Sequence, residues 1–142
     1  MDRSMCRMET KESVELDYSD LIGRPFREFG RGPEAYDCFG LWIEINKRLG
    51  IKVLDYGQLI GENSETICKK ADEYRPKFTK IKEPQPGDLI LFRTDTGLTD
   101  HIGVIVQPGL FLHVLKKQGI LCTYLDNYFW RGRIEGLYRY AG

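Results

Sequence analysis

The stretch that decides the fold covers residues 37–50 and reads DCFGLWIEINKRLG. Counted from Cys38, its apolar side chains recur at i, i+3, i+4, i+7 and i+11, the repeat of one face of an α-helix. Asp37 stands where a carboxylate caps free backbone N–H groups, and Gly50 stands where glycine commonly ends a helix. We therefore predict a helix over residues 38–49 that begins with a cysteine.

The rest of the chain divides into a helical first half and a strand-rich second half. A second helix is expected over residues 64–74, ending before Pro76. Short apolar and β-branched runs between turn residues then predict strands over 88–92, 101–106, 110–115, 120–124 and 134–140. Helices followed by hairpin-spaced strands predict an α+β fold with a mainly antiparallel sheet of about five strands.

Length and charge limit the number of domains and the classes of partner. The 142 residues suit one domain, 1–142, because two would each be too small to hold a core. Residues 1–17 are charged and irregular, so we expect a loosely ordered arm there. Lys plus Arg and Asp plus Glu both number 21, and this zero net charge offers no attraction for nucleic acid. No apolar run is long enough to cross a bilayer, so we expect no membrane insertion.

The four cysteines are widely spaced and form no C-x-x-C pair. The first residues contain no hydrophobic segment of a secretory signal, so we expect synthesis in the cytoplasm with free thiols. Cys6 stands in a charged segment, Cys68 in the second predicted helix and Cys122 in a predicted strand. We interpret these three as packing residues, which leaves Cys38 as the candidate nucleophile.

Cys38 and the only two histidines, His101 and His113, form a candidate catalytic set. The start of a helix carries partial positive charge and unpaired N–H donors, which lower the pKa of a cysteine thiol. A nearby imidazole would stabilise the thiolate and later protonate a leaving amine, and a polar group on its far nitrogen would hold the tautomer. His101 suits the first role and His113 the second, provided that strand register brings them together.

Residue spacing alone leaves two interpretations of Cys38 open. As part of an apolar helix face it is equally well explained as a buried core residue, because cysteine is among the most buried residue types. Asp37 beside it disfavours a thiolate unless its carboxylate turns away to cap the helix. Metal binding is disfavoured, because the chain has no H-x-H, H-E-x-x-H or C-x-x-C spacing. We expect neither a metal nor an organic cofactor.

Four segments, in order, resemble the motifs of the NlpC-type cell-wall peptidases, a papain-like group of cysteine peptidases. Residues 36–41 (YDCFGL) resemble the nucleophile motif D-C-[SWF]-G-[LF], and residues 86–92 (PGDLILF) resemble the P-G-D-L-x-x-F strand. Residues 100–105 (DHIGVI) are similar to the segment that bears the base, and residues 109–114 (GLFLHV) to the segment that bears its orienting residue. This resemblance favours catalysis over packing for Cys38.

The resemblance implies a papain-like fold, with the nucleophile helix packed on the sheet, and an endopeptidase acting on peptidoglycan stem peptides. It implies Cys38 as nucleophile, His101 as base and His113 as the residue that orients the base. The bond that it implies is the γ-linked one between D-glutamate and the following diamino acid. Two alternatives stay open: a papain-like amidase on another γ-glutamyl or acyl amide, and a largely inactive structural tail component.

The chain departs from the family pattern around the expected oxyanion site. Residues 23–30 (GRPFREFG) resemble the family's G-x-P-Y-x-W-G segment, but Phe26 replaces the tyrosine whose hydroxyl is assigned to that site. We expect Tyr36 to take its place beside the backbone N–H groups at the helix start. Asp37 and Asp100, which precede the nucleophile and the base, are assigned as further substrate contacts.

Two features resemble the phage and prophage tail-associated branch of this family: Phe39 directly after the nucleophile, and residues 130–139 (WRGRIEGLYR). Members of that branch usually lack signal peptides, because the virion carries the enzyme to the wall. The resemblance therefore implies phage tail proteins as partners and a virion-associated location, with peptidoglycan peptides as substrate.

Overall fold

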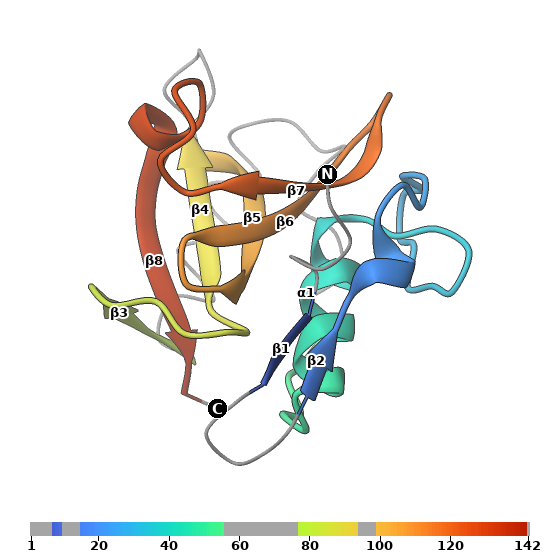
Figure 1. The fold of residues 1–142 in the computed structure, drawn as a ribbon, viewed down its shortest axis with the longest axis horizontal. Coiled ribbons are helices and arrows are strands. Elements are labelled where there is room, and N and C mark those ends of the chain that lie inside the picture. Colours follow the sequence, from blue (N-terminus) through green and yellow to red (C-terminus); the bar gives the residue numbers. More distant parts are fainter. Residues whose placement is uncertain (1–6, 10–14, 56–76, 94–98, 142) are drawn as a thin grey trace.

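The computed structural model describes residues 7–9, 15–55, 77–93 and 99–141, with only the backbone of 7–9, 15, 99 and 100. In this part of the chain one α-helix packs against a six-stranded sheet, and a two-stranded ladder lies beside the helix (Figure 1). The elements are β1 (Arg7–Glu9), β2 (Glu15–Asp17), the 3-10 helix η2 (Ser19–Leu21), α1 (Cys38–Arg48), β3 (Phe78–Ile81), β4 (Leu89–Arg93), β5 (Thr99–Gln107), β6 (Leu110–Leu115), β7 (Gly119–Tyr124), the 3-10 helix η4 (Arg131–Arg133) and β8 (Ile134–Tyr140). The predicted α+β class is confirmed.

The helix α1 begins and ends at its capping residues. The backbone of Asp37 is extended, and its carboxylate accepts a hydrogen bond from the backbone N–H of Gly40 at 2.7 Å. Two residues past the helix, Gly50 has a φ of 77°, in the left-handed region that favours glycine. The prediction of a helix over residues 38–49 is confirmed to within one residue.

The larger sheet has the strand order β3-β8-β4-β5-β6-β7, and every pairing in it is antiparallel. Five of these strands match the predicted runs, whereas β3 was not predicted. Its sequence FTKI lacks a clear apolar alternation, and its two central residues are exposed. The helix predicted over residues 64–74 lies outside the described residues. No helix in the described part of the chain combines the length and the apolar character that spanning a bilayer requires.

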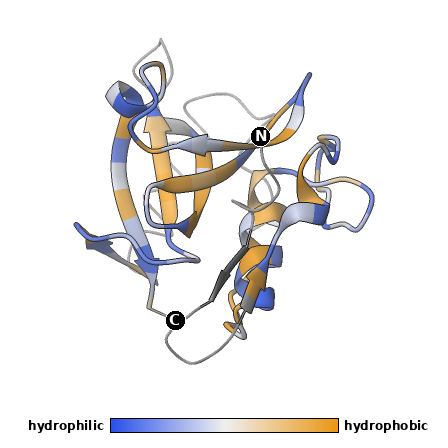
Figure 2. Cartoon of the chain, in the orientation of Figure 1, coloured by the Kyte–Doolittle hydropathy of each residue, from blue (hydrophilic) through white to orange (hydrophobic). Residues whose placement is uncertain are grey.

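Both faces of the sheet carry buried apolar side chains. The face toward α1 packs with the helix through Leu89, Leu91, Ile102, Val104, Val106, Leu110, Leu112 and Val114. On the opposite face lies an aromatic-rich cluster of Ile90, Phe92, Ile105 and Phe111, against which Leu125, Trp130, Ile134 and Leu137 pack. Figure 2 shows the consequence, since β4 and β5 at the centre of the sheet are strongly hydrophobic. Strands covered on both faces are expected to have such continuous apolar runs.

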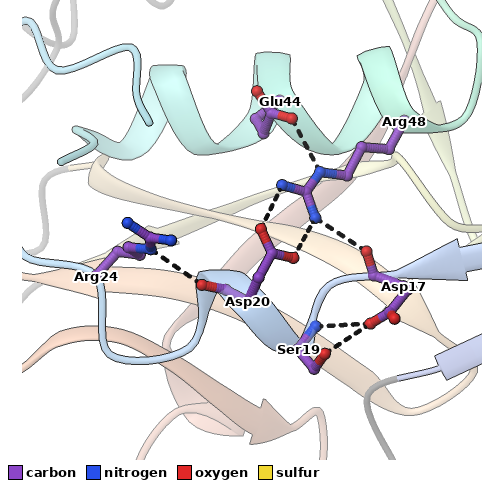
Figure 3. A network of polar contacts seen from close by, with 6 residues as sticks. All are labelled: Asp17, Ser19, Asp20, Arg24, Glu44 and Arg48. Atoms are coloured by element: carbon purple, nitrogen blue, oxygen red, sulfur yellow. Dashed lines mark hydrogen bonds and ion pairs between the residues drawn. The ribbon is translucent and has the colours of Figure 1, made fainter. Parts of the chain in front are cut away.

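Charged side chains around Arg48 tie the segment before α1 to the helix (Figure 3). The Arg48 guanidinium donates two hydrogen bonds to the carboxylate of Asp20, at 2.6 and 2.9 Å. It also donates to the carboxylate of Glu44 at 2.9 Å and to the carbonyl of Asp17 at 3.0 Å. Leu16 is fully buried in the core. Within residues 1–17 the structure describes β1 and β2, which pair with each other, and the loosely ordered arm expected over this range stays a prediction.

The turn before β4 connects the helix to the sheet. Its Gly87 has a φ of 95°, and the carbonyl of Gly87 accepts hydrogen bonds from the Trp42 indole and the Asn46 amide, both at 3.1 Å. The carboxylate of Asp88 accepts two hydrogen bonds from the guanidinium of Arg139, at 2.9 and 2.8 Å. The Pro-Gly-Asp segment recognised in the sequence therefore holds α1, β4 and β8 together.

Candidate active site

Cys38 is the first residue of α1, and its side chain is only 3% exposed. Burial raises the pKa of the Cys38 thiol, and the negative charge of Asp37 raises it further. The backbone N–H groups of Cys38 and Phe39 act in the opposite direction, because they stabilise a thiolate at the helix start. Burial has the larger effect, so the resting thiol keeps its proton.

Asp37 is held in place by two donors on one of its oxygens. Oδ1 accepts hydrogen bonds from the N–H of Gly40 and, at 2.6 Å, from the guanidinium of Arg31. Arg31 in turn binds both carboxylate oxygens of Asp55, at 2.8 Å each. Oδ2 of Asp37 is buried without a hydrogen-bond partner in the described part of the chain. A carboxylate accepts and does not donate, so it cannot serve an oxyanion; its contact with substrate stays a prediction.

The two histidines meet across β5 and β6. Nε2 of His101 lies 3.0 Å from Nδ1 of His113, and Nε2 of His113 lies 3.0 Å from Oγ1 of Thr123 on β7. The register pairs Val104 with Leu112, and its continuation sets His113 opposite Gly103, so both imidazoles lie on one face of the sheet. The strand register, which the sequence leaves open, thus brings the two histidines into contact.

Aromatic rings from β4, from β6 and from the segment before β8 enclose the histidine pair. The Trp130 indole stacks on His101, with ring centroids 5.1 Å apart, and meets His113 edge-on at 4.9 Å. Phe92 contacts His101 at 5.4 Å between centroids, and Phe111 contacts His113 at 4.9 Å. The hydrogen bond between the imidazoles is thus shielded by apolar surface, which strengthens it by lowering the local dielectric.

Burial keeps both imidazoles neutral at physiological pH. It lowers the pKa of His101 to about 4, and burial together with the neighbouring His101 lowers the pKa of His113 to about 3. The cause is desolvation of the charged form, because His113 is fully buried and His101 is 8% exposed. The Cys38 thiol and both imidazoles are therefore uncharged at rest.

The structure does not join Cys38 to the histidines by a hydrogen bond among the residues that it describes. Cys38 belongs to the core cluster shared by α1 and the sheet. The helix packs against β5 and β6, and α1 and β5 both begin toward the upper side of Figure 1. The His101–His113 contact uses Nε2 of His101. This leaves Nδ1 of His101 as the ring nitrogen without a partner in the described part of the chain.

The remaining predicted residues are placed as follows. Tyr36 directly precedes the helix cap, is 2% exposed, and forms isolated backbone bridges with Phe26 and Arg31. Its hydroxyl end packs against Gly32, where any added side chain would overlap the ring. Burial, followed by the charge of Glu44, raises the pKa of Tyr36. Its oxyanion role stays a prediction.

Asp100 lies in β5 immediately before His101. Its side chain is outside the described residues, so its assignment as a substrate contact stays a prediction.

Sequence reasoning missed Thr123, Arg31 and the position of Trp130. Thr123 pairs with Phe111, two positions from Leu121, which pairs with His113, so it shares a face with that histidine. This relationship depends on strand register, which no local pattern reveals. The aromatic segment around Trp130 carries no sequence pattern that links it to the histidines.

The NlpC/P60 family model matches residues 23–139. The probable endopeptidase p60 of Listeria grayi is 24% identical over 139 residues, which cover 92% of this chain and 24% of that protein. The probable endopeptidase NlpC of Escherichia coli K12 is 23% identical over 113 residues, or 77% of this chain and 64% of that protein. The gamma-DL-glutamyl hydrolase of Bacillus subtilis 168 is 24% identical over 131 residues, which cover 89% of this chain and 29% of that protein. The chain thus spans between 24% and 64% of these relatives' lengths.

Solved structures show the same fold. An NlpC/P60 family protein from Bacillus cereus superposes with a TM-score of 0.60 at 20% identity, covering 86% of this chain and 37% of that chain. NlpC1 from Trichomonas vaginalis has a TM-score of 0.58 at 24% identity, covering 84% and 40%. The NlpC/p60 domain of the peptidoglycan hydrolase SagA has a TM-score of 0.53 at 19% identity, covering 84% and 89%. With the family match over most of its length, the chain belongs to the NlpC/P60 family.

Proposed function

We propose that this protein is a cysteine endopeptidase that hydrolyses peptidoglycan stem peptides, with Cys38 as nucleophile, His101 as base and His113 as the residue that orients the base. The observation that carries the proposal is the 3.0 Å contact between Nε2 of His101 and Nδ1 of His113. This contact occupies one nitrogen of His101 and leaves Nδ1 for the cysteine. A cysteine at a helix start, a base and an orienting group are the parts that nucleophilic amide hydrolysis needs.

The reaction starts from the neutral pair. As the scissile carbonyl approaches, the proton of the Cys38 thiol passes to Nδ1 of His101 and Sγ bonds to the carbonyl carbon. The carbonyl electron pair moves to oxygen, which the N–H of Cys38 at the helix start stabilises. When the intermediate collapses, the C–N bond breaks and the imidazolium of His101 protonates the leaving amine. Water, deprotonated by His101, then hydrolyses the thioester.

The bond proposed is the γ-linkage between D-glutamate and the diamino acid of the stem peptide. Support comes from the sequence resemblance and from the names of relatives, which include a probable endopeptidase and a gamma-DL-glutamyl hydrolase. The second of these names also favours the alternative that another γ-glutamyl amide is the substrate. Digestion of both kinds of substrate distinguishes the stem-peptide bond from another γ-glutamyl amide.

Carriage of the enzyme by a virion, with phage tail proteins as partners, is a further part of the proposal. It is supported by Phe39 after the nucleophile and by the segment 130–139, both of which resemble the tail-associated branch of the family. In the structure Phe39 is buried and meets Trp42 edge-on, with ring centroids 6.2 Å apart. Co-purification with virions, probed by an antibody against the protein, would test this part separately.

Digestion of purified muropeptides, read by mass spectrometry, tests the activity and the bond together. Wild type is expected to release fragments cut after γ-D-glutamate, whereas Cys38→Ala releases none. Fragments cut at another bond would replace the bond assignment and keep the mechanism. If wild type cleaves no muropeptide but hydrolyses γ-glutamyl peptides, the alternative amidase is the better description. If it cleaves neither, a structural tail component is favoured.

A further inference from the structure

A pair of histidines is chemically ambiguous in a way that a histidine with a carboxylate is not. Each neutral imidazole has one N–H donor and one acceptor nitrogen, so the contact between His101 and His113 can form with either ring as the donor. The two arrangements place the ring protons at different atoms, although the ring positions are the same. One of them suits catalysis and the other does not.

In the arrangement that suits catalysis, His101 donates the hydrogen bond and His113 accepts it. To receive the thiol proton, Nδ1 of His101 must be unprotonated, and its neutral ring then carries the proton on Nε2. That N–H donates to Nδ1 of His113, which must be the acceptor. His113 therefore holds its own proton on Nε2, and this buried N–H needs an acceptor, because a buried donor without a partner keeps its full desolvation cost.

The Thr123 hydroxyl oxygen is placed where it can be that acceptor. Its Oγ1 lies 3.0 Å from Nε2 of His113. His113 is fully buried, so solvent cannot reach the ring in place of Thr123, and its other neighbours are the rings of Phe111 and Trp130. The Thr123 side chain is partly exposed, which lets its own hydroxyl proton turn toward water while the oxygen accepts.

We propose that Thr123 is a positioning residue: its hydroxyl oxygen holds His113 as the Nε2–H tautomer and thereby keeps Nδ1 of His101 open to the thiol of Cys38. This inference rests on the proposed function for its catalytic consequence. The hydrogen-bond chain itself, from His101 through His113 to Thr123, stands on the two contacts of 3.0 Å. Among the described residues, no charged side chain joins this series of hydrogen bonds.

The test compares wild type with Thr123→Val, which keeps the shape and removes the hydroxyl, and Thr123→Ser, which keeps the hydroxyl. In long-range ¹H–¹⁵N spectra of ¹⁵N-histidine-labelled protein at neutral pH, His113 is expected as the Nε2–H tautomer in wild type and Thr123→Ser. In Thr123→Val its population is expected to shift toward Nδ1–H. This readout requires no activity, and finding Nδ1–H in wild type would overturn the proposal without any variant.

The kinetic arm uses the muropeptide that wild type cleaves. For Thr123→Val we expect kcat to fall roughly 10- to 100-fold with little change in KM, by analogy with loss of the outer partner of a metal-bound histidine. Thr123→Ser is expected to restore most of the rate. A merely structural role predicts instead that unfolding temperatures fall while kcat of the folded fraction is kept, and that result would overturn the inference. If wild type cleaves nothing, the proposed function fails while the tautomer spectra still decide the role of Thr123.

Discussion

The Trp130 indole lies on the His101 imidazole in a stacked arrangement, with an angle of 28° between the ring planes. The contact joins the segment before β8 to β5, and the indole covers one face of the His101 ring. This cover contributes to the desolvation that lowers the pKa of His101.

Trp130→Ala is therefore expected to admit water to the imidazole pair and to raise the pKa of His101 from about 4 toward its ordinary value of 6.5. The titration of the His101 ring, followed by NMR, measures the shift. Trp130→Phe keeps an aromatic cover and is expected to shift the pKa much less. An unchanged pKa in Trp130→Ala would show that the tryptophan does not desolvate the base.

Alkylation of Cys38 by iodoacetamide is expected to accelerate with pH up to the alkaline range in the unliganded protein. The reason is that burial raises the pKa of the Cys38 thiol, while burial also keeps the His101 imidazole neutral, so neither group carries the charge that would stabilise a thiolate. Peptide mass spectrometry resolves the rate at Cys38 from that at Cys122, which is partly exposed. A fast rate at Cys38 that is constant through mildly acidic pH would demonstrate a preformed thiolate instead.

Asp37 offers a way to separate helix capping from charge. Asp37→Asn keeps a side-chain oxygen for the N–H of Gly40 but removes the charge that raises the pKa of Cys38, so alkylation of Cys38 should begin at lower pH. Asp37→Ala loses the cap as well and is expected to cost about 0.5–2 kcal/mol of unfolding free energy. Equal alkylation profiles in Asp37→Asn and wild type would show that the charge of Asp37 does not raise the pKa of Cys38.

Arg31→Met removes the guanidinium that pairs with Asp37 and leaves a buried carboxylate without its partner. We expect a loss of about 1–3 kcal/mol in urea unfolding, less than for a fully buried pair because Arg31 is partly exposed. Arg131→Met is the matched control, since Arg131 lies on the exposed face of η4 and stacks only on the exposed Tyr128 ring. If Arg131→Met lost as much stability as Arg31→Met, the loss could not be attributed to the ion pair between Arg31 and Asp37.

The stability of the protein should fall as the pH decreases below about 6.5. Both histidines have folded-state pKa values below the unfolded value, so the unfolded chain binds more protons in that window and gains stability relative to the fold. Each imidazole contributes at most about 1.4 kcal/mol per pH unit until the pH approaches its folded pKa. Urea unfolding at several pH values measures the slope, and His113→Gln should reduce it. A flat profile in wild type between about pH 6.5 and 5 would contradict the burial of neutral imidazoles.

Gly40→Ala is expected to destabilise the fold, although alanine is the better helix former. A Cβ at position 40 would overlap the carbonyl of Gly30, which approaches the first turn of α1. We expect a cost of about 1–3 kcal/mol in thermal or urea unfolding, the range for overpacking. Gly132→Ala in η4, where a Cβ would meet nothing, serves as the control and should be neutral or slightly stabilising. Equal stability of both variants would disprove the close approach.

The helix and five strands could be predicted because their signals are local. The capping pair Asp37 and Gly50 encloses an apolar repeat, and the strand runs are separated by turn residues. The strand β3 could not be predicted, because its two central residues are exposed and only its pairing with β8 makes it a strand. The roles of Cys38, His101 and His113 were suggested by residue type and motif order. The distances between these residues could not be predicted, because they depend on how the strands pair.

The same limit explains why Thr123 and Trp130 were missed. Each acts through a histidine that is distant in the chain, and each reaches it only after the sheet has formed. The charge of Asp37 was recognised as unfavourable for a thiolate, and the structure resolves this only in part. Its Oδ1 turns to the cap and to Arg31, yet its charge still raises the pKa of Cys38.

The hairpin of β5 and β6 has a bulge between Ile105 and Gln107, directly before the turn that joins the strands. Side chains alternate between faces along a strand, so a slip of one residue would turn His113 to the other face of the sheet, away from His101. The length of the turn at Pro108 and Gly109 is therefore constrained, because it sets the register that brings the two histidines together. An engineered insertion of a single residue there is expected to separate the two imidazoles while leaving a foldable sheet, whereas affinity tags or reporter loops are better accommodated at the exposed Gly132.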